Sequence, residues 1–284
     1  MPERIAVIAG ATRGIGLALV RALAETWGAH DTVYLTARKP TDGQAAVAQL
    51  AGVRAQVQWL PFDMAGPMSA QTLAEALGKR HGGIDIAVLN GAYVSRADQP
   101  AAADARPMIA ANNHGTLRFL RAMAPILKPD ARLVVVASGF GTLKSLPDSL
   151  RPAFDTNTRD PDEINAAMDR YVAAAEAGTA DAEGWPAWVN IPSKVGQVAV
   201  TRAFAKQYAR REERPPGVLV NAACPGLTLT DATRDLMDTV FKGRPAQTPE
   251  EAARDLLWLI TLPAGTSAPY AELVQHRKVL PYGD

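Results

Sequence analysis

Residues Ile5–Leu23 read IAVIAGATRGIGLALVRAL, which is an apolar run of strand type, a glycine loop and the first turns of an amphipathic helix. Three glycines, Gly10, Gly14 and Gly16, stand between the run and the helix. A tight turn, a bare backbone and free N–H groups at a helix N-terminus together suit a pyrophosphate. The stretch therefore predicts a dinucleotide-binding loop rather than an ordinary strand-to-helix turn. We expect its cofactor contacts at Gly10, Thr12, Arg13, Gly14, Ile15 and Gly16.

Short β-branched or aliphatic runs alternate with longer Ala- and Leu-rich amphipathic stretches along the rest of the chain. Such alternation is typical of strand–helix–strand units that feed a parallel sheet. We expect strands at residues 5–9, 32–36, 56–60, 84–89, 132–137, 218–222 and 271–274, and helices at 15–26, 44–50, 68–80, 110–127, 194–210 and 249–260. The prediction is an α/β fold with a doubly wound parallel sheet, formed as a single domain over residues 1–284.

The segment at residues 144–186 interrupts this alternation. It carries Pro147, Pro152, Pro161 and Pro186. Proline fixes φ and removes a backbone donor, so a run of prolines is typical of a connecting segment. We interpret the segment as an insertion ahead of the helix at 194–210, with one helical piece at 161–177, and expect it to form a substrate-side lobe of the same domain.

The charge and cysteine content exclude several classes of protein. The chain has 284 residues, 30 Lys plus Arg and 29 Asp plus Glu, so nothing predicts a field that attracts nucleic acid or an acidic membrane. The single cysteine, Cys224, excludes an intramolecular disulfide and a cysteine-built metal site. Apolar runs fall far short of the roughly 20 residues that span a bilayer, and no basic-then-apolar leader precedes the first strand. We expect a cytoplasmic protein that binds a small-molecule substrate and no metal.

The end of the second expected strand indicates the type of dinucleotide. An NAD site offers an acidic residue to the ribose hydroxyls roughly 20 residues beyond the glycine loop. That place is held here by Arg38, with Lys39 next to it and no carboxylate. Arg38 and Arg13 are planar, bidentate donors suited to a 2′-phosphate, although either also fits a solvated surface position. The predicted cofactor is NADP(H).

Further motifs occur along nearly the whole chain. They are AGATRGIG at residues 9–16, FDM at 62–64, VLNGA at 88–92, NNHGT at 112–116, VVVASGFG at 134–141, EGWP at 183–186 and NAACPGLTLTD at 221–231. Together they resemble the short-chain dehydrogenases/reductases, and within them the branch of monomeric carbonyl reductases. The resemblance implies a Rossmann fold, an oxidoreductase, and a monomer, since insertions like that at 144–186 lie over the helix that other members use to dimerise.

The resemblance also implies roles for residues that match the family position by position. Asp63 would contact the adenine, Asn90 would line the cofactor, and Pro225, Gly226 and Thr230 would hold the nicotinamide carboxamide. Simpler roles remain for Asp63 as a turn cap and for Thr230 as a helix cap.

Three of the family's catalytic residues match this chain. Ser138 would fix the substrate oxygen, Lys194 would hold the nicotinamide ribose, and Asn112 would support Lys194 through water. The fourth, a Tyr that donates the proton, belongs four residues before Lys194, where this chain has Asn190. We expect Ser138 and Asn190 to orient the substrate.

The missing Tyr changes the expected chemistry. Hydride addition to a ketone leaves an alkoxide that needs a proton, and a carboxamide has none to give near neutral pH. Pro192 adds to the departure, because proline interrupts helical bonding and biases Ile191 towards an extended conformation. We therefore expect the helix to begin after Pro192 and the reach of Lys194 to be shifted.

Four functions remain open. A different group, Tyr93 or a water held by Asn190 and Lys194, protonates a carbonyl product, or the substrate is an imine or iminium that needs no acid at the hydride step. Alternatively, the chain catalyses a non-redox cyclisation or isomerisation on a retained NADP(H) scaffold, or it is a cofactor-binding pseudoenzyme. Of these we expect an NADPH-dependent reductase with an atypical active site, acting on a bulky apolar C=O or C=N substrate.

Apolar side chains flank the expected site. Trp185 and Trp188 stand at the end of the insertion and either stack on a flat or cationic substrate or simply pack the loop. Phe140 and Leu143 follow Ser138 and indicate an apolar pocket wall. A small hydrophilic substrate is therefore disfavoured.

Overall fold

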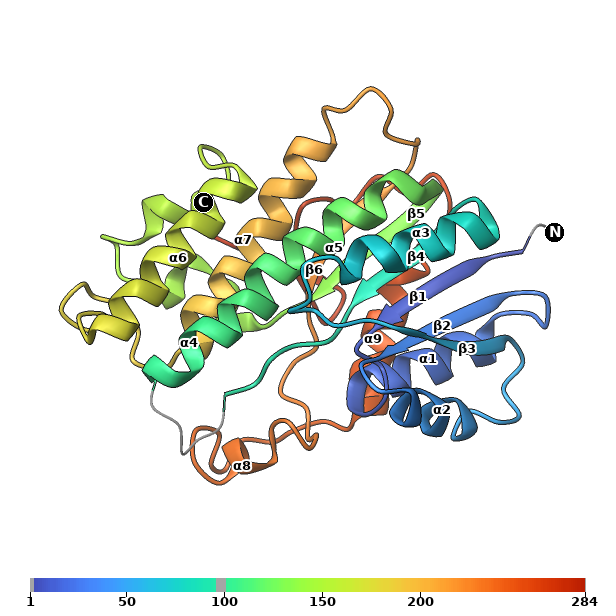
Figure 1. Cartoon of the computed structure of the whole chain (residues 1–284), viewed down its shortest axis with the longest axis horizontal. Coiled ribbons are helices and arrows are strands. Elements are labelled where there is room, and N and C mark those ends of the chain that lie inside the picture. Colours follow the sequence, from blue (N-terminus) through green and yellow to red (C-terminus); the bar gives the residue numbers. More distant parts are fainter. Residues whose placement is uncertain (1–2, 96–100, 284) are drawn as a thin grey trace.

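The computed structural model describes residues 3–95 and 101–283, which form one eight-stranded sheet with helices on both faces (Figure 1). The strands are β1 (Ile5–Ala9), β2 (Thr32–Ala37), β3 (Gln56–Pro61), β4 (Ile84–Leu89), β5 (Leu127–Val136), β6 (Leu219–Cys224), β7 (Leu273–Gln275) and β8 (Lys278–Leu280). Their order is β3-β2-β1-β4-β5-β6-β7-β8, and all neighbouring pairs are parallel except β7 with β8. The predicted single-domain α/β fold with a doubly wound parallel sheet is confirmed.

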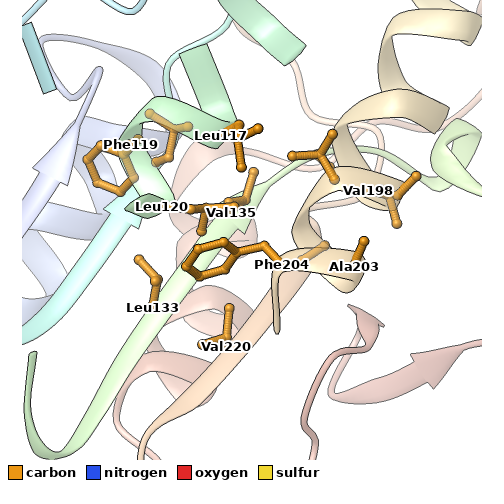
Figure 2. Packing of buried hydrophobic residues seen from close by; sticks show 14 of the residues in the cluster. Leu117, Phe119, Leu120, Leu133, Val135, Val198, Ala203, Phe204 and Val220 are labelled. Atoms are coloured by element: carbon orange, nitrogen blue, oxygen red, sulfur yellow. The ribbon is translucent and has the colours of Figure 1, made fainter. Parts of the chain in front are cut away.

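Two layers of helices cover the sheet. One face carries α1 (Gly14–Thr26), α2 (Pro40–Ala48) and α9 (Pro249–Ile260), and the other carries α3 (Ser69–His81), α5 (Gly115–Met123) and α7 (Asn190–Tyr208). Figure 2 shows how Leu120 of α5 and Phe204 of α7 meet Leu133 and Val135 of β5. Burial of each such side chain stabilises the fold by roughly 1.5–3 kcal/mol, so this layer holds the ends of β5 and α7 in place. In the described part of the chain, no helix is both long and apolar enough to cross a membrane.

A crevice for a dinucleotide is expected where the strand order reverses, between β1 and β4. The chain winds outwards from β1 to β2 and β3, then returns to β4 and continues through β5 and β6 in the opposite direction. Because these strands are parallel, the residues that follow β1, β4, β5 and β6 lie along one edge of the sheet. This edge brings together the glycine loop, Asn90, Ser138 and Pro225.

The helix expected at residues 110–127 has a different form. It starts earlier, as α4 (Ala101–Ile109), passes through a π-helical turn at Ala110–His114 and ends as α5. Leu127, expected at the helix end, already belongs to β5. π-helical turns inside α-helices occur frequently at functional sites, and this one contains Asn112.

α7 begins at Asn190, so the expectation that Pro192 delays the helix and extends Ile191 is wrong. Ile191 N donates to Trp188 O at 2.9 Å, and Ser193 N donates to Val189 O at 3.3 Å. The first N–H groups of a helix have no partner inside it, so the donor that Pro192 lacks is not missed there. Asn190 and Lys194 therefore lie one helical turn apart on the same face.

The sheet ends in a hairpin that the sequence pattern did not indicate. The strand expected at 271–274 is β7, displaced by up to two residues, and it pairs with β8 in antiparallel register. Between them His276 and Arg277 have φ of 49° and 61°, as a two-residue hairpin turn requires. Asp255 of α9 binds both side chains at 3.0 Å, so a distant residue fastens this turn.

The segment at 144–186 consists of 3₁₀ turns and α6 (Pro161–Ala177), whose predicted bounds are confirmed. α6 packs against α4 and α7 (Figure 1). Its ion pairs to the preceding helices are His114–Asp169, Arg106–Glu176 and Arg121–Asp162. The insertion thus covers these helices with residues of the same chain. The monomeric state remains a prediction.

Candidate active site

The glycine loop after β1 is held by close contacts that leave no room for a side chain. Gly10 has a φ of 74°, and a Cβ there would lie 2.3 Å from Gly91 Cα in the loop after β4. A Cβ on Gly16 would lie 2.7 Å from the Asn90 side-chain nitrogen. Asn90 Nδ2 also donates to Gly10 O at 2.8 Å, so the loops after β1 and β4 are locked together.

The N-terminus of α1 faces this loop without a cap. No side chain caps the helix at Arg13, and its first turn contains no acidic residue. The positive end of the helix dipole and the N–H groups of Gly14, Ile15 and Gly16 therefore suit an anion. With the half-buried Thr12 beside them, these residues fit the pyrophosphate that the sequence predicts.

Two guanidinium groups lie at the same end of the crevice. Arg38 follows β2 and is exposed, with no ion pair within the described residues. Arg13 lies 3.8 Å from Asp231, but both side chains are more than half exposed, so the pair is weak. Both groups can therefore turn towards a phosphate.

Asp63, which follows β3, caps a turn. Its Oδ1 accepts from Ala65 N at 3.0 Å, and its own N donates to Ser69 Oγ at 2.8 Å. This is the simpler of the two roles that the sequence left open. The carboxylate is exposed, and its contact with adenine remains a prediction.

The loop after β6 lies at the same edge of the sheet and approaches the glycine loop. Gly226 has a φ of 81°, and Gln247 Nε2 donates to Pro225 O. The Thr230 methyl lies 3.4 Å from where a Cβ on Gly14 would stand, so this loop reaches back over the start of α1. Pro225, Gly226 and Thr230 therefore lie in one loop that approaches the start of α1. Their contact with the nicotinamide carboxamide remains a prediction.

Ser138 is seated against the first turns of α7. It follows β5 with a half-exposed side chain, and its Oγ accepts from Phe140 N at 3.2 Å. The short 3₁₀ turn at Gly139–Gly141 then packs on α7, since a Cβ on Gly141 would lie 2.9 Å from Lys194 O. The turn that follows Ser138 thus packs against the backbone of Lys194.

Lys194 is a buried cation without a counter-anion among the described residues. Its side chain is 8% exposed, and Nζ donates to Gln197 Oε1 at 2.8 Å. Burial lowers the pKa of Lys194 from 10.5 to about 8. Burial also raises the pKa of the nearby Cys224 thiol, so that group stays neutral and provides no partner charge. Buried charges are normally paired, which makes this arrangement unusual.

The side chain of Asn112 ties the loop after β4 to α7. It is fully buried; its Oδ1 accepts from Tyr93 N at 2.7 Å, and its Nδ2 donates to Tyr93 O at 3.0 Å and to Ser193 Oγ at 3.2 Å. The side chain therefore has its partners in the protein. Support of Lys194 by Asn112 through water remains a prediction.

The hydroxyl of Tyr93 is committed to a carboxylate. It donates to Asp104 Oδ1 at 2.8 Å, and this bond, together with burial, raises the pKa of Tyr93. Asp104 is itself only 3% exposed. A phenol held in this way is a poor proton donor to a substrate, which weakens the case for Tyr93 as the relocated acid.

Asn190 opens α7 with a half-exposed side chain. Its amide makes no hydrogen bond within the described residues. Because it precedes Lys194 by one turn, this amide can bind a substrate or a water beside the ammonium group.

Three aromatic rings from separate parts of the chain gather next to Ser138 and Asn190. The ring centroids of Phe140 and Trp188 are 5.6 Å apart, and Phe241 lies 6.3 Å from each of them. Phe241 comes from the segment after β6, whose Leu229 and Val240 are exposed by 50% and 48%. This apolar wall agrees with the expectation for Phe140.

Two other residues of the expected wall belong to the core instead. Trp185 is 6% exposed and packs on Phe154 and Tyr171, so it fastens the insertion. Leu143 is 4% exposed in the same cluster. For Trp185 this is the simpler of the two roles that the sequence left open, and the burial of Leu143 also favours a packing role.

Sequence reasoning missed Gln197, Thr116 and Phe241. Gln197 has a readable signal, since a polar residue three positions after Lys194 shares its helix face. Phe241 has none, because it stands in a loop without a motif and meets the other two rings only through the fold.

Comparisons with known proteins find relatives in sequence and in fold. Residues 4–148 match the family model described as short chain dehydrogenase. Carbonyl reductase (NADPH) 1 of Rattus norvegicus is 30% identical over 282 residues, which cover 98% of either chain.

Solved structures show the same fold. The menthone neomenthol reductase from Mentha piperita superposes with a TM-score of 0.77 at 21% identity, over 98% of this chain and all of that one. A short chain dehydrogenase from Burkholderia cenocepacia J2315 in complex with NADP gives a TM-score of 0.64 at 21% identity, over 96% of this chain and 95% of that one.

Burial of Lys194 predicts how stability depends on pH. Folding lowers its pKa from 10.5 to about 8, so between these values the unfolded chain holds more protons. The free energy of unfolding should therefore rise as pH increases through this range. In urea unfolding from about pH 7 to about pH 10, Lys194→Met should lose this rise, which amounts to up to about 3 kcal/mol. An equal pH slope in both proteins would contradict a buried, unpaired ammonium.

Proposed function

Because this chain belongs to the short-chain dehydrogenase/reductase family, it is an oxidoreductase, and we propose that it uses NADPH to reduce a bulky, apolar C=O or C=N substrate. The observation that carries the proposal is the placement of Lys194. Lys194 is buried in the first turns of α7, one turn after Asn190, and its backbone lies against the turn that follows Ser138.

The crevice fits NADPH. The pyrophosphate fits the uncapped N-terminus of α1, next to the side-chain-free contact of Gly10 with Gly91. A 2′-phosphate fits the guanidinium groups of Arg13 and Arg38. Lys194 would hold the nicotinamide ribose. When bound, NADPH supplies the hydride. The rat relative is named for NADPH and one solved neighbour contains NADP, which supports this choice.

Lys194 and a water at Asn190 are the proton source that the described residues favour for a carbonyl substrate. Ser138 hydrogen-bonds the substrate oxygen, and the ammonium stabilises the negative charge that grows on it. A pKa of about 8 makes Lys194 a competent acid near neutral pH. Tyr93 does not fit this task, because its hydroxyl already donates to Asp104.

Imine reduction is a second candidate, and the observation that favours it is Asn190 itself. An iminium carbon that accepts hydride becomes a neutral amine, so the missing phenol is no handicap. The buried Lys194 ammonium opposes it, because two positive charges repel each other in a poorly solvated site. The carbonyl reaction is therefore the first candidate.

The aromatic wall supports a bulky apolar substrate. Phe140, Trp188 and Phe241 form it, with Leu229 and Val240 exposed nearby. Binding a large apolar group would bury this surface and stabilise the complex by roughly 25 cal/mol per Å² of apolar area removed from water.

Arg38 should determine the preference for the phosphorylated cofactor. Loss of a charged hydrogen bond to the 2′-phosphate removes about 1.5–3 kcal/mol of binding free energy. In fluorescence titrations, Arg38→Ala should therefore weaken NADPH binding by about tenfold or more and leave NADH almost unchanged. The exposed Arg211, which follows α7, provides a control in Arg211→Ala. Equal wild-type affinities for NADPH and NADH would contradict the assignment.

Loss of NADPH absorbance with aldehydes, ketones and cyclic imines tests the reaction. We expect bulky apolar ketones to be reduced mole for mole with NADPH, at a rate that falls as pH rises through about 8, where Lys194 loses its proton. Reduction of an N-alkylated iminium, which carries its charge at every pH, should not fall in this way. Product without loss of NADPH would make the chain a non-redox cyclase or isomerase, and no turnover at all would favour a pseudoenzyme.

Asn190→Tyr should increase ketone reduction. α7 is regular from Asn190 onwards, so a phenol there would stand one turn before Lys194. A positioned acid typically contributes 10²–10⁴-fold, and a partly positioned one should still give about tenfold in kcat. Asn190→Phe, with the same ring and no hydroxyl, is the matched control.

Two outcomes would redirect this assignment. Equal kcat values for the Tyr and Phe variants at position 190, with NADPH still bound, would mean that the pocket no longer accepts a phenol there. Loss of wild-type activity in Tyr93→Phe would restore Tyr93 as the acid.

A further inference from the structure

A chain of three hydrogen bonds runs from Lys194 to the π-helical turn before α5. Lys194 Nζ donates to Gln197 Oε1 at 2.8 Å, and Gln197 Nε2 donates to Thr116 Oγ1 at 3.2 Å. Thr116 Oγ1 then donates to Asn112 O at 2.6 Å. Gln197, Thr116 and Asn112 are all fully buried, so solvent does not compete for these bonds.

The donor-to-acceptor direction of these three hydrogen bonds is determined at Asn112, where the series ends. The backbone oxygen of Asn112 can only accept, so the single proton of the Thr116 hydroxyl points to it. Thr116 Oγ1 must then accept from the amide nitrogen of Gln197. The amide oxygen of Gln197 consequently faces Lys194, which is the orientation that an ammonium group needs.

Lys194 keeps two of its three N–H donors for other partners. An ammonium group has three donors, and the described residues use one of them, through Gln197. In this protein Asn190 occupies the place one turn before Lys194, and it offers the lysine no charge. An uncharged acceptor at Gln197 therefore orients the ammonium without neutralising it.

We propose that Gln197, oriented by Thr116, is a positioning residue that aims the two remaining donors of Lys194 at the cofactor ribose and at the oxygen of the substrate. The inference rests on the proposed function for what Lys194 binds. The contact between Gln197 and Lys194 stands on its own geometry.

Lysine NMR in the cofactor-free full chain tests the contact directly. With ¹³Cε-labelled lysine, Gln197→Glu should move the titration of Lys194 up by about one unit or more, because a carboxylate favours the ammonium form. Gln197→Met keeps the side-chain length, removes the acceptor and should move the titration down. Cys224, the other titratable group that acts on Lys194, is unchanged in both variants. Gln207→Met alters an exposed residue of the same helix and should leave the titration in place.

NADPH titration tests whether Gln197 directs the ammonium group of Lys194 towards the cofactor. Gln197→Met should weaken NADPH binding by about tenfold, as expected for one misdirected charged hydrogen bond. Thr116→Val removes the hydroxyl that orients Gln197, together with its bond to Asn112 O, and should weaken binding several-fold, with α7 itself unaltered. Gln207→Met should bind NADPH as the wild type does.

The NMR and NADPH titrations distinguish a failure of the inference from a failure of the proposed function. An unshifted Lys194 titration in both Gln197 variants would overturn the inference, and so would weaker NADPH binding without a shift. Wild-type protein that binds no NADPH would instead overturn the proposed function, and the NMR titration would still report on the contact. Thr116→Val lies on a different helix, so it keeps the inference testable if both Gln197 variants fail to fold.

Discussion

The site depends on two backbone segments that meet with no side chain between them. Gly10 and Gly91 end the neighbouring strands β1 and β4, and a Cβ on Gly10 would lie only 2.3 Å from Gly91. The bond from Asn90 to Gly10 O holds the two loops in this position. α1 consequently starts with its bare N-terminus at the point where the strand order reverses, and the loops after β5 and β6 complete the same edge (Figure 1). A larger residue at Gly10 would separate the loops and close the crevice from below.

In the proposed reaction, the chemistry follows from one buried charge, the ammonium group of Lys194. A phenol in place of Asn190 would lie one turn from Lys194 and could share a proton with it. Without it, the partners of the ammonium among the described residues are the uncharged amide oxygen of Gln197 and the buried thiol of Cys224. Such a cation favours reactions in which negative charge grows nearby, and this is the reason for proposing a carbonyl ahead of an iminium. In the proposed function, the aromatic wall of Phe140, Trp188 and Phe241 selects the size and polarity of the substrate.

Features with a local cause could be predicted from the sequence, and features with a distant cause could not. The glycine loop with α1 and the capped helices α6 and α9 are indicated by residues within them or next to them. The predicted bounds of these helices agree with the structure to within a residue. Pro192 misled the prediction because its rule holds for helix interiors, whereas this proline stands in the first turn of α7. The β7–β8 hairpin depends on Asp255, far away in the chain. For Gln197 the sequence carries half of the signal, the helix face that it shares with Lys194, while Thr116, which orients its amide, comes from another helix.

The last described residues of the chain form part of the wall around Ser138. Leu143 N donates to Tyr282 O at 2.9 Å, the Tyr282 hydroxyl donates to Phe154 O at 3.0 Å, and a Cβ on Gly139 would lie 4.0 Å from Leu280. β1 begins at the opposite edge of the sheet from Ser138, because β1, β4 and β5 are parallel and Ser138 follows the carboxyl end of β5. An affinity tag or fluorescent fusion attached after Tyr282 would therefore pull on the turn that carries Ser138. The same tag placed before β1 would leave that turn undisturbed, so N-terminal fusions suit assays and immobilisation of this protein.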